Sequence, residues 1–241
     1  MNKLLIPILF LGLILRVAYL DKFPIGLYSD EAVFGYNAYL LIQTGHDEYN
    51  RFWPVSLESF GDWKPPMQAW LAIPFVWALG LNEYAVRLPS AILGTLTILI
   101  VYLLAKEFFS RSNHFNHSTI PLFSSFLLAI SPWHIFMSRV AMLVAIEVFF
   151  VSSGVLFLLK GLKNSKFWLV ASLSFAGATY SYYGSRVTVP LILLIFTLVY
   201  FNELKSRLRG LLIPIVVGTI LLSPLVFSAF KNSLFLTGRA R

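Results

Sequence analysis

Residues 21–64 read DKFPIGLYSDEAVFGYNAYLLIQTGHDEYNRFWPVSLESFGDWK and form the only sizeable polar region of this chain. The region concentrates acidic side chains and a lysine: Asp30, Glu31, Asp47, Glu48, Glu58, Asp62 and Lys64. The sequence on either side of it is dominated by long apolar runs. A carboxylate-rich segment held against a bilayer by hydrophobic helices indicates chemistry at the membrane surface, so this is where we look for function.

The composition excludes several classes of protein. Of the 241 residues, 58% are hydrophobic and only 12% are charged, whereas a soluble globular chain carries about twice that share of charge. The absence of cysteine excludes disulfides, thiolate zinc sites and a cysteine nucleophile. The net charge of +8 is typical of the cytoplasmic loops of a membrane protein, and we expect no nucleic-acid partner.

Apolar runs long enough to cross a hydrocarbon core of about 30 Å recur along the chain. They lie at about 4–20, 87–109, 119–137, 140–160, 166–184, 187–202 and 209–230, with a shorter run at 66–81. No small-residue cleavage site follows the first run, so we expect an uncleaved first span. Arg16 lies near the end of that span, and we expect its side chain to reach the interface.

Lysine and arginine in the short loops predict the orientation in the membrane. Three loops, separated by pairs of spans, carry Lys106, Arg111, Lys160, Lys163, Lys166, Lys205, Arg207 and Arg209. If these loops are cytoplasmic and Lys3 is also inside, then 66–81 cannot cross the membrane, because a crossing would reverse the later loops. The short segment 66–81 contains Pro74, and we expect a juxtamembrane helix that dips into the outer leaflet and returns.

The prediction is therefore an all-α polytopic protein of the cell membrane, with about seven transmembrane helices and a cytoplasmic N-terminus. Residues 21–86 become one extracytoplasmic loop with juxtamembrane helices, the first of them over 31–43. We expect one transmembrane domain over 1–241. The polar tail 237–241 after the last span suggests the front part of a longer protein.

Asp30 and Glu31 stand where the polar loop enters the helix predicted at 31–43. Ser29 or Asp30 is expected to cap that helix, and acidic residues suit the positive end of a helix dipole. For Glu31 this capping role and a role in the site remain equal alternatives. For Asp30 we favour function, because a carboxylate in a partly dehydrated site can act as a general base.

The motif Gly61-Asp62-Trp63-Lys64-Pro65-Pro66 fixes a lysine at headgroup depth. The two prolines force an extended entry to the next helix, so Lys64 is held at its start. A rigid lysine there suits a lipid phosphate, the alternative being an ordinary interface anchor. Asp62 is expected to pair with it.

Arg87, Arg139 and Arg186 each lie at the outer end of a span, against the usual charge bias. Together with Lys64 they favour an anionic ligand, although pairing with carboxylates of the loop is an alternative for each. Tyr183 belongs to the same candidate binding set as Arg186. Glu147, inside a predicted span, is either functional or an internal partner for Arg16 or Arg139.

No pair of histidines among His46, His114, His117 and His134 has metal-ligand spacing, and no glycine-rich phosphate loop is visible. We expect no metal or cofactor requirement, while a single divalent cation near Asp30 or Asp62 stays an open alternative. A phosphate donor, if there is one, is expected to be carried by a lipid.

Three ordered motifs carry a family resemblance: Tyr28-Ser29-Asp30-Glu31-Ala32, the Gly61–Pro66 motif, and Arg87-Leu88-Pro89-Ser90-Ala91. They resemble the membrane glycosyltransferases of family 39, which include protein O-mannosyltransferases and the aminoarabinose transferase that modifies lipid A. Segments 131–139 and 180–186 resemble the prokaryotic branch. The resemblance covers essentially the whole chain and implies a GT-C fold.

The resemblance also implies an activity: inverting transfer of a sugar, for instance mannose, from a polyprenyl-phosphate donor to an extracytoplasmic protein, lipid or glycan acceptor. Carried over residue by residue, Asp30 would be the catalytic base and Glu31 would support the site. Lys64 would bind the donor phosphate, and Arg87 would help to hold the first loop. The alternatives are a non-catalytic, flippase-like protein that binds lipid-linked sugars and a scaffolding membrane protein.

Overall fold

The computed structural model describes residues 3–59, 61–109 and 119–231, with side chains described as far as residue 228. Arg111, His114, His117 and the tail 237–241, to which the sequence predictions refer, lie outside the described residues. The predictions for those positions therefore stay predictions.

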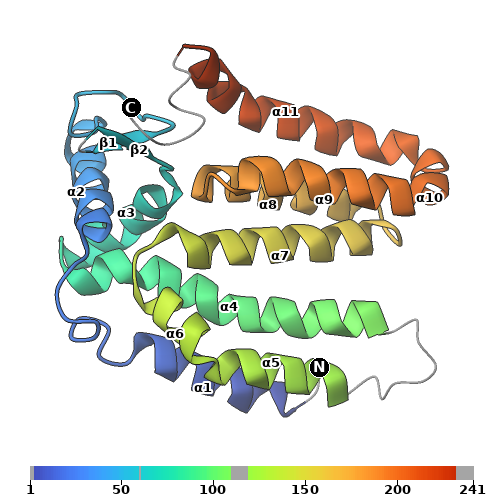
Figure 1. The fold of residues 1–241 in the computed structure, drawn as a ribbon, viewed down its shortest axis with the longest axis horizontal. Coiled ribbons are helices and arrows are strands. Elements are labelled where there is room, and N and C mark those ends of the chain that lie inside the picture. The colour runs from blue at the N-terminus through green and yellow to red at the C-terminus, as the bar shows by residue number, and fades with distance from the viewer. Residues whose placement is uncertain (1–2, 60, 110–118, 232–241) are drawn as a thin grey trace.

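Most of the chain forms a bundle of helices that run along its long axis (Figure 1). The bundle consists of α1 (Leu5–Val17), α4 (Glu83–Phe109), α5 (Thr119–Ile130), α7 (Leu143–Gly161), α8 (Lys166–Ser181), α9 (Ser185–Val199) and α11 (Leu208–Lys231). The short helices α6 (Pro132–Arg139) and α10 (Phe201–Lys205) connect neighbouring members. These helices coincide with the apolar runs that the sequence predicted as spans.

The number of membrane crossings is confirmed only in part. Among the described residues, α4, α7 and α11 are long and apolar enough to cross a membrane. The pair α5 and α6, bent by 57° at Ser131, makes a fourth span if it is counted as one. Helices α1 and α9 are apolar but have only 13 and 15 residues, short of the ~20 that a straight crossing needs.

Close helix packing in the bundle depends on small residues. Helices α7 and α8 lie side by side because Gly161 leaves room for the buried Trp168 ring, which would come within 2.0 Å of a Cβ placed at that glycine. The Trp168 indole N–H donates to the carbonyl of Leu158 at 3.3 Å, so its polar atom is satisfied inside the bundle.

The first polar segment folds into a cap at one end of the bundle (Figure 1). It contains α2 (Ser29–Thr44), the strands β1 (Leu57–Ser59) and β2 (Asp62–Lys64), and α3 (Met67–Leu79). Helix α3 begins directly after Pro65-Pro66 and ends at Gly80, whose φ of 78° is in the left-handed region that glycine adopts freely. The predicted juxtamembrane helices are thus present. Helix α2 extends slightly beyond the expected range 31–43, and α3 is slightly shorter than the expected range 66–81.

The cap is held to the bundle by a small apolar interface. The buried face of α2 carries Val33, Phe34, Asn37, Ala38 and Leu41, at the spacing of one helical side. Ala38 packs with Ala72 and Val76 of α3 and with Val86 of α4. The antiparallel hairpin, in which Leu57 lies opposite Lys64, and a single β-bridge between His46 and Phe52 depart from the all-α prediction.

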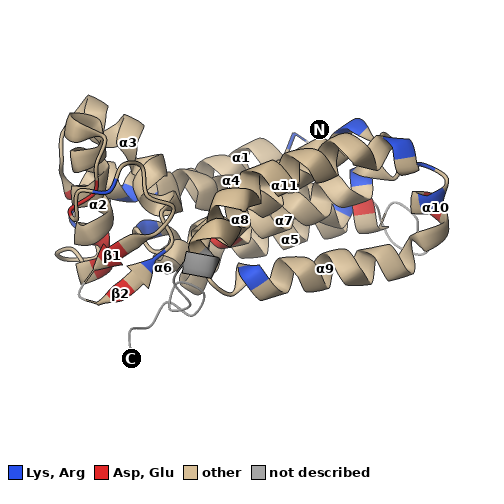
Figure 2. Cartoon of the chain, turned by 90° about the horizontal axis from the view of Figure 1, so that it is seen from above, with Lys and Arg blue, Asp and Glu red and all other residues tan. Residues whose placement is uncertain are grey.

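The two ends of the bundle differ in charge (Figure 2). Acidic side chains gather at the cap, over α2, β1 and β2, whereas lysine and arginine dominate the opposite end near α10. That end is where α4 and α7 finish and where α8 and α11 begin, so the described basic residues of the predicted loops lie at one end of the bundle.

Candidate functional site

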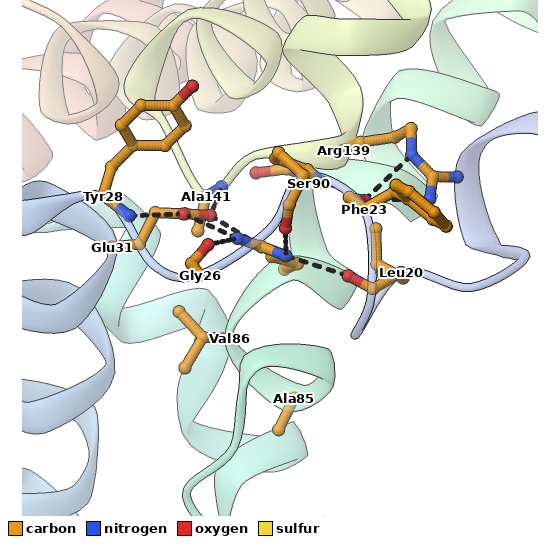
Figure 3. Close-up of polar contacts among 12 residues, drawn as sticks. Leu20, Phe23, Gly26, Tyr28, Glu31, Ala85, Val86, Ser90, Arg139 and Ala141 are labelled. Atoms are coloured by element: carbon orange, nitrogen blue, oxygen red, sulfur yellow. Dashed lines mark hydrogen bonds and ion pairs between the residues drawn. The ribbon is translucent and has the colours of Figure 1, made fainter.

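A buried arginine on α4 ties the cap to the bundle, and its partners Leu20, Gly26 and Glu31 are labelled in Figure 3. Arg87 is fully buried, and its Nε and Nη2 donate to the two carboxylate oxygens of Glu31 at 2.9 and 3.0 Å. Its Nη1 donates to the carbonyls of Leu20 and Pro24 at 3.0 and 2.9 Å, and Nη2 also reaches the Gly26 carbonyl. One side chain thereby fixes the loop between α1 and α2.

Glu31 is equally buried and makes two further contacts. Its carboxylate accepts hydrogen bonds from the backbone N–H of Tyr28 at 2.9 Å and of Ala141 at 2.7 Å. The first of these caps the start of α2, so the expectation that Ser29 or Asp30 provides the cap is wrong. We call Glu31, Arg87 and their backbone partners the loop anchor.

The loop anchor decides between the alternative roles of its two charged residues. The contacts of Arg87 agree with the expected role in holding the first loop. They do not support direct binding of substrate by Arg87, because its guanidinium is fully enclosed. Glu31 has both oxygens engaged by backbone and arginine donors, which fits a positioning role and leaves it no access to a reacting group.

Asp30, one residue earlier, faces the other way and meets β2. Lys64 Nζ lies 3.0 Å from Asp30 Oδ1 and 3.4 Å from Asp62 Oδ2. The lysine side chain is only 12% exposed, whereas the two aspartates are 42% and 48% exposed. We call these three residues the open cluster: a shielded cation between two carboxylates that remain accessible.

The geometry of a strand explains why Asp62 and Lys64 act together. Alternate side chains of a strand point to the same face, so both lie on one side of β2 and Trp63 lies on the other. On the far side, Arg51 stacks over the Trp63 ring at 4.6 Å and pairs with Glu58 on β1. The hairpin is thus stiffened from behind, which holds Lys64 in place.

Tyr183 and Arg186, at the turn from α8 to α9, approach the open cluster from the bundle. The Arg186 guanidinium lies 4.8 Å from the centre of the Tyr183 ring. Burial raises the pKa of the Tyr183 hydroxyl, and the negative charges of Asp62 and Asp30 add to this shift, while Arg186 opposes it. The hydroxyl is buried and makes no hydrogen bond to another described residue. Tyr183 therefore presents an unused polar atom near the two aspartates.

Aromatic packing holds this turn against the cap. The Trp70 ring of α3 and the Tyr180 ring of α8 lie 5.5 Å apart, and the Tyr180 hydroxyl donates to the Leu221 carbonyl of α11 at 2.8 Å. The cap, α8 and α11 consequently meet at one point beside the open cluster.

Comparison with known proteins places this arrangement in a family. Residues 63–228 match the family described as dolichyl-phosphate-mannose-protein mannosyltransferase. The chain belongs to that family. The matched region includes Lys64, Arg87 and the helices from α3 to most of α11, while α1, Asp30 and Glu31 precede it.

Two curated relatives of this mannosyltransferase-family chain come from Bacillus subtilis (strain 168). The putative mannosyltransferase YkcB is 24% identical over 216 residues, which cover 88% of this chain and 28% of the relative. The putative mannosyltransferase YycA is 22% identical over 216 residues, covering 86% of this chain and 30% of the relative. The chain thus spans less than a third of the length of these relatives.

Two solved structures share the fold of the family member. ArnT from Cupriavidus metallidurans in the apo state superposes with a TM-score of 0.71 at 18% identity, covering 96% of this chain and 42% of ArnT. ArnT bound to undecaprenyl phosphate gives a TM-score of 0.67 at 17% identity, with the same coverage. The expected GT-C fold is confirmed, and with the membrane-length helices it makes the chain a multi-pass membrane protein.

Arg139, a further expected ligand of the substrate, points away from the open cluster in this family member. It donates to the carbonyls of Leu15 and Tyr19, both at 3.0 Å, and to that of Phe23 at 2.9 and 3.2 Å. These carbonyls lie at the end of α1 and in the turn after it. The contacts support a role in fixing α1 and do not support contact with substrate.

Arg16 forms a second buried arginine network, which the sequence alone did not predict. Arg16 does not reach the interface as expected, because it is fully buried between α1 and the bend from α5 to α6. It donates to the carbonyls of Gly12, Leu128 and Ala129 at 2.9 to 3.1 Å, and lies 2.7 Å from His134 Nδ1. The signal was available in Ser131-Pro132, which breaks a run of apolar residues and frees carbonyls within it.

Glu147 has a different partner from either that was expected. Its carboxylate accepts a hydrogen bond from Ser185 Oγ at 2.6 Å, which joins α7 to α9, so the expected pairing with Arg16 or Arg139 is not seen.

Among the described residues no group of three or more histidine, aspartate or glutamate side chains could hold a metal ion. The expectation that no metal is required remains a prediction.

Proposed function

We propose that this chain forms the donor-binding and catalytic part of a membrane glycosyltransferase. It would move a sugar from a polyprenyl-phosphate donor to an extracytoplasmic acceptor, with inversion at the transferred carbon. The observation that carries the proposal is the open cluster, in which a shielded lysine stands between two accessible aspartates at the cap end of the bundle. Mannose is the first sugar to test, in view of the family name.

Lys64 is the group proposed to bind the donor phosphate. In the structure its ammonium is paired with Asp30 and Asp62, and a phosphate entering the site would compete for the same charge. Taking Lys64 away from Asp30 would leave that carboxylate free to accept a proton. Donor binding and activation of the base are thereby linked in one exchange of ion-pair partners.

Asp30 is proposed to accept the proton of the acceptor hydroxyl. The hydroxyl oxygen would form a bond to the anomeric carbon as the bond from that carbon to the phosphate oxygen breaks. Polyprenyl phosphate would leave with the electron pair, its charge stabilised by Lys64. Positioning at the bilayer surface and this electrostatic stabilisation would supply most of the rate.

Tyr183 and Arg186 are proposed to complete the phosphate side of the site. Both lie at the turn from α8 to α9, and the charges of Asp30 and Asp62 act on the Tyr183 hydroxyl. That hydroxyl can donate a hydrogen bond, as a phosphate oxygen or a sugar oxygen would require. The undecaprenyl phosphate present in one ArnT structure supports a donor of this kind.

The proposed orientation places the open cluster outside the cytoplasm. Lysine and arginine dominate the opposite end of the bundle, and such residues favour the cytoplasmic side. Helix α1 begins toward that same end, so the proposed orientation gives a cytoplasmic N-terminus. The orientation can be measured by labelling the variants Asn50→Cys and Asn202→Cys with a membrane-impermeant thiol reagent on intact cells. We expect labelling at residue 50 and none at residue 202. Labelling at residue 202 alone would reverse the orientation.

The decisive test is transfer from a panel of polyprenyl-phosphate sugars, made with this chain and with a longer form that includes the remainder of its relatives' length. We expect release of polyprenyl phosphate with one or a few sugars, and none with the corresponding nucleotide sugars. Donor that binds but returns unconsumed in both forms would favour the non-catalytic, lipid-linked-sugar-binding alternative instead.

A further inference from the structure

A groove runs along the bundle between α9 and α11, with α8 as its floor. One part of it, of about 240 Å³, is lined by Phe175 and Leu222 among other apolar residues, and a second part, of about 540 Å³, by Phe196 and Leu208. The two parts share Leu158, Trp168, Leu193, Leu211 and Ile215, so they form one continuous apolar channel.

The channel opens into a polar, basic mouth at the end of the bundle opposite the open cluster. The mouth has a volume of about 530 Å³ and is lined by Ser165, Lys205, Arg207 and Arg209, with no acidic residue in its lining. It shares Lys205 and Leu208 with the apolar channel. Nearby, Glu203 is exposed on α10, and Glu107 is paired with Lys163.

The length of the channel matches one leaflet of a bilayer. Its lining along α11 extends from Leu208 to Leu222, roughly 21 Å at the rise of an α-helix. Half of a bilayer of about 40–45 Å, headgroup regions included, is about 20–22 Å. A chain anchored at the basic mouth would therefore end near the middle of the membrane.

We propose that this groove binds an anionic phospholipid from the leaflet at the basic end of the bundle. Its phosphate would lie among Lys205, Arg207 and Arg209, and one acyl chain would occupy the channel between α9 and α11. Basic pockets between transmembrane helices suit anionic headgroups. A second copy of the chain fits less well, because its own basic mouth would bring like charges together.

This site is separate from the proposed donor site. The open cluster lies at the cap, whereas the basic mouth lies at the other end of the bundle (Figure 2). The phospholipid would bind in one leaflet and the sugar donor in the other. Failure of either proposal leaves the other standing.

The test is native mass spectrometry of the detergent-purified chain with phosphatidylglycerol or phosphatidylcholine of identical acyl chains. We expect the anionic lipid to bind more tightly. The double variant Lys205→Gln, Arg209→Gln should weaken phosphatidylglycerol binding about 25-fold, because each lost charge lowers the affinity about fivefold. Lys3→Gln with Lys106→Gln removes the same charge at the same end outside the groove, and should change the affinity less than about twofold.

A second pair of variants tests the acyl-chain part of the site. Leu193 lines both parts of the channel, whereas Leu194 does not. Leu193→Trp should lower the affinity for the long-chain lipid, and Leu194→Trp should leave it unchanged. Should both variants misfold, raising salt from about 50 mM to about 500 mM with the unaltered chain should weaken only phosphatidylglycerol binding.

Three results would overturn the proposal. The first is equal binding of the two lipids, and the second is an equal loss in the groove variants and their controls. The third is a stable dimer that excludes lipid from the groove, which would assign the surface to a second copy.

Discussion

Asp30 and Glu31 are neighbours in the sequence, yet they belong to two regions with opposite surroundings. Glu31 is fully buried in the loop anchor, where Arg87 and two backbone N–H groups satisfy its carboxylate. Asp30 is 42% exposed in the open cluster and contacts Lys64, which can exchange partners. Adjacent residues on a helix point about 100° apart, so a single turn can place one carboxylate inside and the other at the surface.

A carboxylate can therefore either stabilise the fold or take part in a reaction, depending on its access to water and ligands. In the loop anchor, loss of one partner leaves a buried charge without compensation, which is costly. In the open cluster, each charge can be hydrated when its partner leaves. We therefore expect stability and activity to respond to changes in these two regions in opposite ways.

The largest expected effect is on activity at Asp30. Asp30→Asn should lower the rate of sugar transfer about 10²- to 10⁴-fold, the contribution of a positioned general base. Stability should fall by less than about 1 kcal/mol, because the broken ion pair is partly exposed. Transfer assays and thermal unfolding in the same detergent measure both quantities, and full turnover in this variant would remove Asp30 from the mechanism.

Glu31→Gln should show the reverse pattern. It leaves Arg87 buried against a neutral amide, so the free energy of unfolding should fall by about 3–5 kcal/mol. The exposed carboxylate Asp21 provides the matched control, because Asp21→Asn should leave stability nearly unchanged. Equal unfolding temperatures for Glu31→Gln and this control would contradict the importance of the loop anchor.

Lys64 tests the donor side of the open cluster. Lys64→Gln should raise the KM for the polyprenyl-phosphate donor about 10- to 100-fold, the worth of a charged hydrogen bond. The KM for the acceptor should stay within about threefold, and Lys64→Arg should restore part of the donor affinity. If donor and acceptor constants rise together, the lysine is a membrane anchor rather than a phosphate ligand.

Tyr183 gives the smallest effect and a pH signature. Burial and the nearby aspartates raise the pKa of its hydroxyl in the folded protein above the usual value of about 10. The resulting stability is fully present below about pH 10, and it is lost as the pH rises from there through the folded pKa. Between pH 9 and 11, Tyr183→Phe should therefore lose thermal stability less steeply than the unaltered chain, and parallel curves would contradict this placement.

Charge counting along the sequence was enough to predict the general organisation. The placement of basic residues in alternate loops required that 66–81 stay on one side, and α3 does lie in the cap with α2. The meeting of Asp30 and Lys64 was also predictable, since both motifs belong to one family pattern. Each of these inferences uses order along the chain and needs no knowledge of side-chain packing.

The roles of the individual arginines could not be predicted in this way. Arg87 and Arg139 were grouped with Lys64 because all three are basic and lie at the outer side. Their guanidinium groups instead bind backbone carbonyls at the end of α1 and in the loop that follows it. Which carbonyls lack a partner depends on where each helix stops and how it is rotated, and those features arise only from packing.

The Arg16 contacts have a consequence for how the protein enters the membrane during synthesis. Its acceptors Leu128 and Ala129 are made 112 and 113 residues later, so the first helix emerges long before its charge can be satisfied. An arginine at the centre of an inserting helix costs about 2.5–3.5 kcal/mol, and Arg16, in the last turn of α1, costs less than that but is still unfavourable. We expect α1 to insert poorly by itself and to be secured only when α5 and α6 have been made, which a glycosylation-mapping assay on nascent chains of increasing length would measure.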